Sequence, residues 1–484
     1  MSKGVVVRRR TFITSSAAVA GSAALIGLSG GTATAFDGGD LTAAERTDAR
    51  RPETIAARQL IFGVENVDPE TGLLPRNRVI VAWTSNSSFA LAVTGRVIFL
   101  DTFITRLEVT PGRTPVVIKD LVDVAPHAIL LGHGHFDHAD NAAYLAAKTG
   151  ATLYASEETC SDMRSDFERM SKDPMIQNDP VARFPSDATL DLVPVTTTGS
   201  TPGTQILRLN ILEPFAQTVA FRHLHSIATP YDPTYPRNAL IPADGILPVD
   251  PRDAALFPAG TPLPPSDPPL PGQLNIRTGG SRGAGGPVAI FYNITLRTGS
   301  NLSLAWQDTI GALRDGKGSA WPDGTPVDGQ RIIDILSRMA PVDVYSAAVG
   351  TANFLNNGLR DLIDYQHALQ PRMFIPNHQT TGGAGVGETQ SVEQYAIYIQ
   401  QLRDMNVPQS EWPDNRWNVD PFDYLKPVVF DASTPDAATH ERRRAQLVHF
   451  DQFPYAEDVR GRVGAQAAPA AVAVSSGLAD EVCF

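Results

Sequence analysis

His133-Gly134-His135-Phe136-Asp137-His138 gathers three of the ten histidines of this 484-residue chain into six consecutive positions. The apolar run 127–131 just before it predicts a buried strand, and the sequence from about residue 140 predicts a helix. The histidines therefore lie in a loop that leaves a buried strand, a place where functional side chains are commonly displayed. This context favours a metal site over a histidine-rich surface loop that binds nothing.

The spacing within this loop suits two cations. His133 and His135 alternate across Gly134, so an extended backbone can direct both imidazoles toward one cation. Asp137 and His138 lie beyond the bend and can reach a second cation nearby. Imidazole and carboxylate ligands suit zinc, and also iron or manganese, while the absence of nearby cysteine argues against a structural zinc site.

A second histidine pair ends the predicted strand before a proline-rich segment. In Phe221-Arg222-His223-Leu224-His225 the two histidines share one face, so only one of them need be a ligand. We favour His225 because it is nearer the loop. His223 would then either pack in the core or contact the metal ligands without binding the metal itself.

Two further candidates follow predicted strands later in the chain. Asp308 comes after the apolar run 302–306, where its carboxylate could bridge two cations. A lone aspartate in such a place is more often a turn or helix-cap residue, and the histidine loop is what favours a ligand here. The second candidate is His378, which follows another predicted strand. Pro376 is expected to turn the chain out of that strand just before Asn377 and His378.

The order of these residues resembles the metallo-β-lactamase superfamily. Its signature loop matches at His133, His135, Asp137 and His138, and its later ligand positions match at His225, Asp308 and His378. The resemblance implies an α/β fold of the αββα sandwich type, with two facing sheets, helices outside and metals at one edge. It covers about residues 75–385. The segments 83–89 and 97–101 are similar to the branch of the ascorbate-6-phosphate lactonases, to which phospholipase D-type enzymes are related.

The resemblance also implies a role for each candidate residue. His133, His135 and His225 would bind one metal; Asp137, His138 and His378 would bind the other; Asp308 would bridge them. Asp137 is in addition the candidate for orienting the nucleophile and carrying its proton. Asp101, at the end of a predicted strand, either orients a ligand imidazole or caps its own loop.

Two divalent cations held roughly 3.5–4 Å apart make a hydroxide available at neutral pH. We therefore expect a dinuclear hydrolase, most simply with zinc, in which a metal-bridging hydroxide cleaves an ester, lactone or similar acyl bond. The alternative is a phosphodiesterase of phospholipase D type that uses the same metal pair. A redox enzyme is disfavoured, because the flavodiiron branch has Glu where this chain has His135 and no flavin-binding domain is evident.

Charge and cysteine content narrow the partners. The chain has 40 basic and 52 acidic residues, and residues 36–484 have 36 and 52. This excess of acidic residues disfavours nucleic acid as the main partner, so we expect a small-molecule substrate.

The two cysteines of the chain cannot form a disulfide framework, and Cys160 is expected to be an inert thiol. The run Arg442-Arg443-Arg444 is expected to be a solvated helix face.

The first 35 residues resemble a twin-arginine export signal. Arg8-Arg9-Arg10-Thr11-Phe12-Ile13 precedes a short apolar run and small residues, although Ser or Thr is usual where Arg8 stands. The run is too short for a stable membrane span, so we expect export to the periplasm or the cell exterior.

The rest of the chain divides by composition. The segment 230–272 has 13 prolines in 43 positions and is interpreted as a surface insertion. We therefore expect an export signal (1–35), an N-terminal extension (36–75), a catalytic domain (76–390) with that insertion, a C-terminal extension packed on the domain (391–462) and a disordered tail (463–484).

Overall fold

The computed structural model describes residues 41–104, 116–227, 240, 286–350, 357, 359–378, 391–418, 423–433 and 437–461. All of them belong to one unit that begins at Ala35. The expected export signal, the expected tail and the proline-rich insertion, apart from Leu240, lie outside the described residues.

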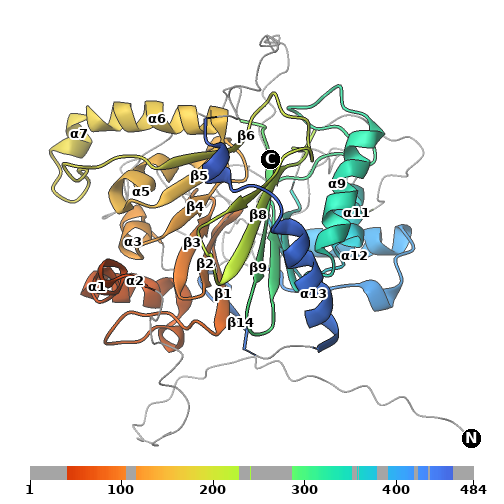
Figure 1. Ribbon diagram of the computed structural model, residues 1–484, viewed down its shortest axis with the longest axis horizontal. Coiled ribbons are helices and arrows are strands. Elements are labelled where there is room, and N and C mark those ends of the chain that lie inside the picture. Colours follow the sequence, from red (N-terminus) through yellow and green to blue (C-terminus); the bar gives the residue numbers. More distant parts are fainter. Residues whose placement is uncertain are drawn as a thin grey trace, which may run out of the picture. The chain divides into compact units, whose positions relative to one another are not determined.

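Two seven-stranded sheets form the centre of this unit (Figure 1). In spatial order, the first sheet consists of β14 (Val428–Asp431), β1 (Arg78–Ser85), β2 (Ser88–Val93), β3 (Arg96–Leu100), β4 (Ala128–Leu130), β5 (Thr152–Ser156) and β6 (Leu192–Thr196). The second consists of β13 (Asp414–Asn415), β12 (Met373–Asn377), β11 (Val344–Ala348), β10 (Ser303–Trp306), β9 (Ile290–Leu296), β8 (Ala216–Arg222) and β7 (Ile206–Leu209).

Each sheet is antiparallel on one side and parallel on the other. Strands β14, β1, β2 and β3 pair antiparallel, and β3 to β6 pair parallel. In the second sheet β7 to β10 pair antiparallel, and β10 to β13 pair parallel. As a result β4, β8, β10 and β12 point their carboxyl ends toward one edge of the two-sheet core, which is where the predicted ligands follow.

Apolar side chains of the two sheets pack against each other. Val79 and Val93 of the first sheet border the same small space as Ile294 and Leu304 of the second, and all four belong to one continuous buried core. Most strands are buried along their whole length because helices cover their outer faces, which explains the near-continuous apolar runs in the sequence.

Helices cover both outer faces. Figure 1 shows α3, α5 and α6 beside the first sheet and α9, α11 and α12 beside the second. The α-helices of the described residues are α1 (Ala43–Ala49), α2 (Pro52–Phe62), α3 (Ile118–Asp123), α4 (Phe136–Ala139), α5 (Ala142–Thr149), α6 (Glu157–Ser171), α7 (Pro174–Gln177), α9 (Pro326–Met339), α11 (Arg360–Leu369), α12 (Ser391–Asp404), α13 (Ala437–Phe450) and α14 (Ala456–Val459). Short 3₁₀ turns in the same part of the chain span Val64–Asn66 and Gln409–Glu411. This layering confirms the predicted αββα fold class. Among the described residues no helix is long and apolar enough to cross a membrane.

The C-terminal segment does more than pack on the domain. Its strand β13 pairs with β12, and its strand β14 pairs with β1 in the register Arg78↔Asp431. The segment therefore supplies an edge strand to each sheet. Helix α13 is also tied to the core, since Gln217 of β8 donates a hydrogen bond to the carbonyl of Leu447 at 3.0 Å.

The expectation of a solvated face at 442–444 is wrong for its central residue. Arg443 is fully buried, while Arg442 and Arg444 are exposed. The Arg443 guanidinium donates to the carbonyl of Pro341 at 3.0 Å, to the carbonyl of Asn301 and to Asp343 Oδ2 at 2.8 Å. These acceptors replace water around the charge, so one residue of the basic run faces inward.

Candidate metal centre

The seven predicted ligands come together at one edge of the two sheets. His133 and His135 lie in the loop after β4, and Asp137 and His138 lie on the short helix α4 that follows. His225 comes after β8, Asp308 after β10 and His378 directly after β12. The first sheet therefore supplies four of the side chains and the second sheet three.

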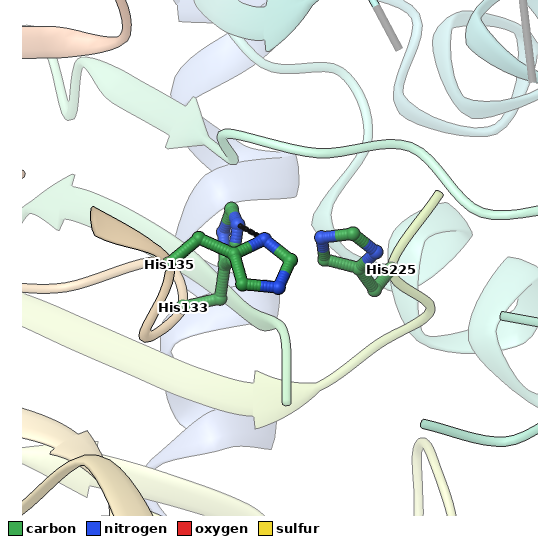
Figure 2. Close-up of side chains that lie close together, drawn as sticks. All are labelled: His133, His135 and His225. Atoms are coloured by element: carbon green, nitrogen blue, oxygen red, sulfur yellow. Dashed lines mark hydrogen bonds between the residues drawn. The ribbon is translucent and has the colours of Figure 1, made fainter. Parts of the chain in front are cut away.

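His133, His135 and His225 form one cluster, here called the metal-one group. Their candidate ligand nitrogens lie within 4.8 Å of one another. His133 Nε2 is 3.0 Å from His135 Nδ1, and the ring of His225 lies 4.6 and 4.8 Å from the other two ring centres. Figure 2 shows the three rings directed toward a shared space.

Asp137, His138 and His378 form a second cluster, the metal-two group. Asp137 Oδ2 is 3.1 Å from His378 Nε2 and 3.4 Å from His138 Nε2. All three side chains are buried. Since His378 follows a strand of the second sheet, this group spans both sheets.

Asp308 lies between the two groups. Its Oδ2 is 2.8 Å from His133 Nδ1 and 3.1 Å from His138 Nδ1, and these three residues make a third candidate ligand cluster. The carboxylate fits against the backbone of Gly132, where a Cβ atom would lie 2.2 Å from the Asp308 Cγ. One carboxylate therefore contacts a member of each group, as a bridging ligand would.

The residues fit a pair of cations. Asp137 Oδ1, Asp308 Oδ1 and His138 Nε2 are buried and have no hydrogen-bond partner within the described part of the chain. Leaving a carboxylate oxygen buried and unpaired is costly, and buried charges are normally paired or bound to metal. A mixed imidazole and carboxylate set of this kind suits zinc, iron or manganese.

The metal-one imidazoles are in the form that binds metal. Burial lowers the pKa of His133 and of His135 to about 3, and it holds the pKa of His225 well below its ordinary value. All three rings are therefore neutral at neutral pH, and each has a nitrogen lone pair to offer.

Asp137 and Asp308 stay ionised. Burial would raise the pKa of each carboxyl, but the imidazoles beside them outweigh this effect. His138 and His378 act on Asp137, and His133 and His138 act on Asp308. The pKa of both carboxyl groups is therefore held well below its usual range, so that both can serve as anionic ligands.

Asp101 contacts the imidazole of His138, one of the predicted ligands. Its Oδ2 is 2.8 Å from His138 Nδ1, and its Oδ1 accepts a hydrogen bond from the backbone N–H of Gly132 at 3.0 Å. Burial and the neighbouring Asp308 raise the pKa of Asp101 to about 7. Burial would lower the pKa of His138, but the carboxylates of Asp137, Asp308 and Asp101 raise it well above its ordinary value.

The two histidines after β8 lie in different surroundings. His223 is in none of the three candidate ligand clusters; its Nδ1 is 3.3 Å from the Tyr365 hydroxyl, and its ring packs edge-on against Phe291. His225 Nδ1 is 2.8 Å from the carbonyl oxygen of Ser226. Because a carbonyl can only accept, Nδ1 of His225 donates, and the lone pair of the neutral ring is on Nε2.

Several residues that shape the site were not among the site residues predicted from the sequence. Asn86 and Ser87 contact the metal-two group from the turn between β1 and β2. Ser319 lies with its Oγ 3.3 Å from His225 Nδ1 and donates to the carbonyl of Ser226 at 2.6 Å. Serine and asparagine are common turn residues, so nothing local in the sequence marks these three as part of a site.

Comparison with known proteins gives limited matches. No family model matches the chain. Over 84 residues, 17% of its length, the chain is 36% identical to a protein of Myxococcus xanthus (strain DK1622) described as a UPF0173 metal-dependent hydrolase. The match covers 28% of that relative, so the chain spans less than a third of its length.

Solved structures are similar at low sequence identity. Igni18, a metallo hydrolase from the hyperthermophilic archaeon Ignicoccus hospitalis, is 12% identical with a TM-score of 0.38, and the match covers 73% of this chain and 98% of that one. The metallo-β-lactamase fold protein YhfI from Bacillus subtilis is 8% identical with a TM-score of 0.36, and the match covers 73% and 99%.

Proposed function

We propose that this protein is a metal-dependent hydrolase of the metallo-β-lactamase superfamily that holds two divalent cations. The observation that carries the proposal is the position of Asp308, which contacts His133 of the metal-one group and His138 of the metal-two group. The order of the ligands along the chain and the name of the Myxococcus relative support it. Zinc is the simplest candidate, with iron or manganese as alternatives.

Each residue of the site has a role in this proposal. The metal-one group would hold one cation, the metal-two group the other, and Asp308 would be shared. A bound pair would lower the pKa of water toward neutrality and polarise the bond to be cleaved. The free Oδ1 of Asp137 would accept a hydrogen bond from the nucleophile, orient it and take up its proton.

A covalent route through the described cysteine is disfavoured. The Cys160 side chain is fully buried, and burial raises the pKa of its thiol to about 12. The thiolate is the nucleophilic form, and it is scarce at neutral pH under these conditions. Hydrolysis without an enzyme-bound acyl group fits the residues that converge here.

We propose an ester, lactone or similar acyl compound as the substrate. This choice follows the resemblance of segments 83–89 and 97–101 to the lactonase branch. The acidic body adds mild support, since a net charge of −12 repels polyanions. A phosphodiester cleaved by the same pair of cations is the alternative.

The test combines metal analysis with a substrate panel. Protein purified without added metal is analysed for zinc, iron and manganese, and then assayed on lactones, carboxylic esters and phosphodiesters. About two ions per chain and preferred turnover of lactones or esters are expected. Preferred turnover of phosphodiesters would replace the acyl substrate by the alternative, and a metal-free protein that takes up no added cation would overturn the proposal.

Export is a separate proposal that rests on the first 35 residues. The pair Arg9-Arg10, followed by an apolar run, resembles a twin-arginine signal, and folding before export would let the protein load its metals inside the cell. A fusion of residues 1–35 to a reporter is expected to be exported. The variant R9K/R10K is expected to stay in the cytoplasm; equal export of both fusions would contradict the assignment.

A further inference from the structure

The turn between β1 and β2 contacts all three members of the metal-two group. It does so through Asn86 and Ser87, which are both buried and belong to none of the three candidate ligand clusters. The name "86–87 turn" is used for these two residues.

Asn86 joins the two sheets at this point. Its side-chain Nδ2 donates a hydrogen bond to the backbone carbonyl of Asp137 at 3.0 Å. Its backbone carbonyl accepts a hydrogen bond from the backbone N–H of His378 at 3.3 Å. The backbone of Asn86 has a positive φ of 38°, a conformation that Asn adopts more readily than most residues. This twist turns the carbonyl and the side chain toward ligands that come from different sheets.

Ser87 acts on the third member of the group. Its Oγ is 2.7 Å from Asp101 Oδ2 and 2.7 Å from His138 Nδ1. A carboxylate oxygen only accepts, so the hydroxyl donates to Asp101 and can accept from His138 Nδ1–H. This arrangement fixes the ring orientation and leaves His138 Nε2 facing Asp137, without a hydrogen bond of its own in the described structure.

We propose that the 86–87 turn positions the metal-two ligands, so that affinity for the second cation depends on two residues that do not bind it. This inference rests on the proposed function, because it presumes that a cation binds there. The metal-one group is held by different contacts: His225 by the carbonyl of Ser226, and His133 by Asp308. Changes at the turn should therefore separate the two sites.

The variants Asn86→Gly and Ser87→Ala test this dependence. Glycine accepts the positive φ and removes the side-chain hydrogen bond to Asp137. Alanine at 87 removes the hydroxyl that contacts Asp101 and His138. Loss of such outer contacts typically weakens metal binding about 10–100-fold. The matched control is Ser88→Ala, since Ser88 is the next residue, is equally buried and has an Oγ with no hydrogen-bond partner among the described residues.

Metal-free protein is titrated with Zn²⁺ against a chromophoric chelator, and with Co²⁺ while its visible absorption is followed. The wild type and Ser88→Ala are expected to take up two ions. Asn86→Gly and Ser87→Ala are expected to keep one tight ion, bind the second about 10–100-fold more weakly, and lose the absorption of only one cobalt ion. Circular dichroism and thermal melting of each variant show whether it is folded.

The outcomes separate this inference from the proposed function. A wild type that binds no cation would overturn the proposed function and the inference with it. Two equally tight ions in the wild type and in both turn variants would overturn the inference alone. Equal weakening of both ions would also overturn it, because the turn would then support the site as a whole. If one variant does not fold, the other carries the test.

Discussion

His133 Nδ1 lies 2.8 Å from Asp308 Oδ2, which joins the loop after β4 in the first sheet to the end of β10 in the second. Both side chains are fully buried. Because the carboxylate oxygen accepts, Nδ1 of His133 donates and Nε2 keeps the lone pair that faces His135. The contact between the sheets thereby also sets which nitrogen of His133 is available to a cation.

Replacing His135 by alanine should remove one cation and leave the fold intact. The side chain lies in a loop at the edge of the sheets and is partly exposed, so it contributes little to the buried core. With only two imidazoles left in the metal-one group, we expect about one ion per chain and at least about a 100-fold loss of turnover. Elemental analysis, circular dichroism and an assay on the best substrate of the panel measure this; full activity in the variant would contradict the proposed site.

Replacing Gly132 by alanine should displace the carboxylate of Asp308, although Gly132 is not itself one of the predicted ligands. The new Cβ would lie 2.2 Å from the Asp308 Cγ, so the carboxylate must move. We expect weaker binding of both cations, because Asp308 contacts both groups, and lower activity. Isothermal titration with Zn²⁺ measures the binding.

The control for this variant is Gly150→Ala. Gly150 has a φ of 72° but open space where a Cβ atom would lie, so alanine there costs about 1–2 kcal/mol of stability through backbone strain. Its metal binding should equal that of the wild type. Equal loss of binding in both variants would show that a general loss of stability, rather than displacement of Asp308, is responsible.

The strands that carry the ligands could be predicted because their sequences are continuous apolar runs that end in polar loops. The predicted strands at 127–131 and 302–306 correspond to β4 and β10 within one or two residues. Strand β13 gives no such signal because it has only two residues, and the apolar run of β6 is interrupted by Pro194. Proline is tolerated there since β6 lies at the edge of its sheet.

The supporting contacts could not be predicted from the sequence. Asn86 and Asp137 are 51 positions apart, and Arg443 and Asp343 are 100 apart, so their pairing depends on the finished fold. Only tertiary packing distinguishes such a side chain from its neighbours. The ligand loop could be recognised because three histidines and an aspartate within six positions are an uncommon combination. The 86–87 turn has no such combination of residues.

Cys160 should be unreactive in the folded protein. Burial disfavours the charged thiolate and raises the pKa of the thiol to about 12, so at pH 8 only about 1 in 10⁴ molecules would have the reactive form. In the variant Cys483→Ser, which leaves Cys160 as the single cysteine, Ellman's reagent is expected to detect no thiol under native conditions and one in guanidinium. Rapid labelling of the native variant at pH 8 would show that the side chain is accessible.

Replacing Arg443 by alanine should destabilise the protein strongly, although Arg443 is not one of the predicted ligands. The change removes a buried cation that donates to the carbonyl of Pro341 and to Asp343 Oδ2, and it leaves both acceptors without this partner. Breaking such a buried arrangement costs about 3–5 kcal/mol. The adjacent exposed Arg442 is the matched control, and Arg442→Ala should change stability by less than about 0.5 kcal/mol. Denaturant unfolding of the three proteins measures the difference, and equal stability of the two variants would show that the inward-facing guanidinium contributes nothing to holding α13 against the second sheet.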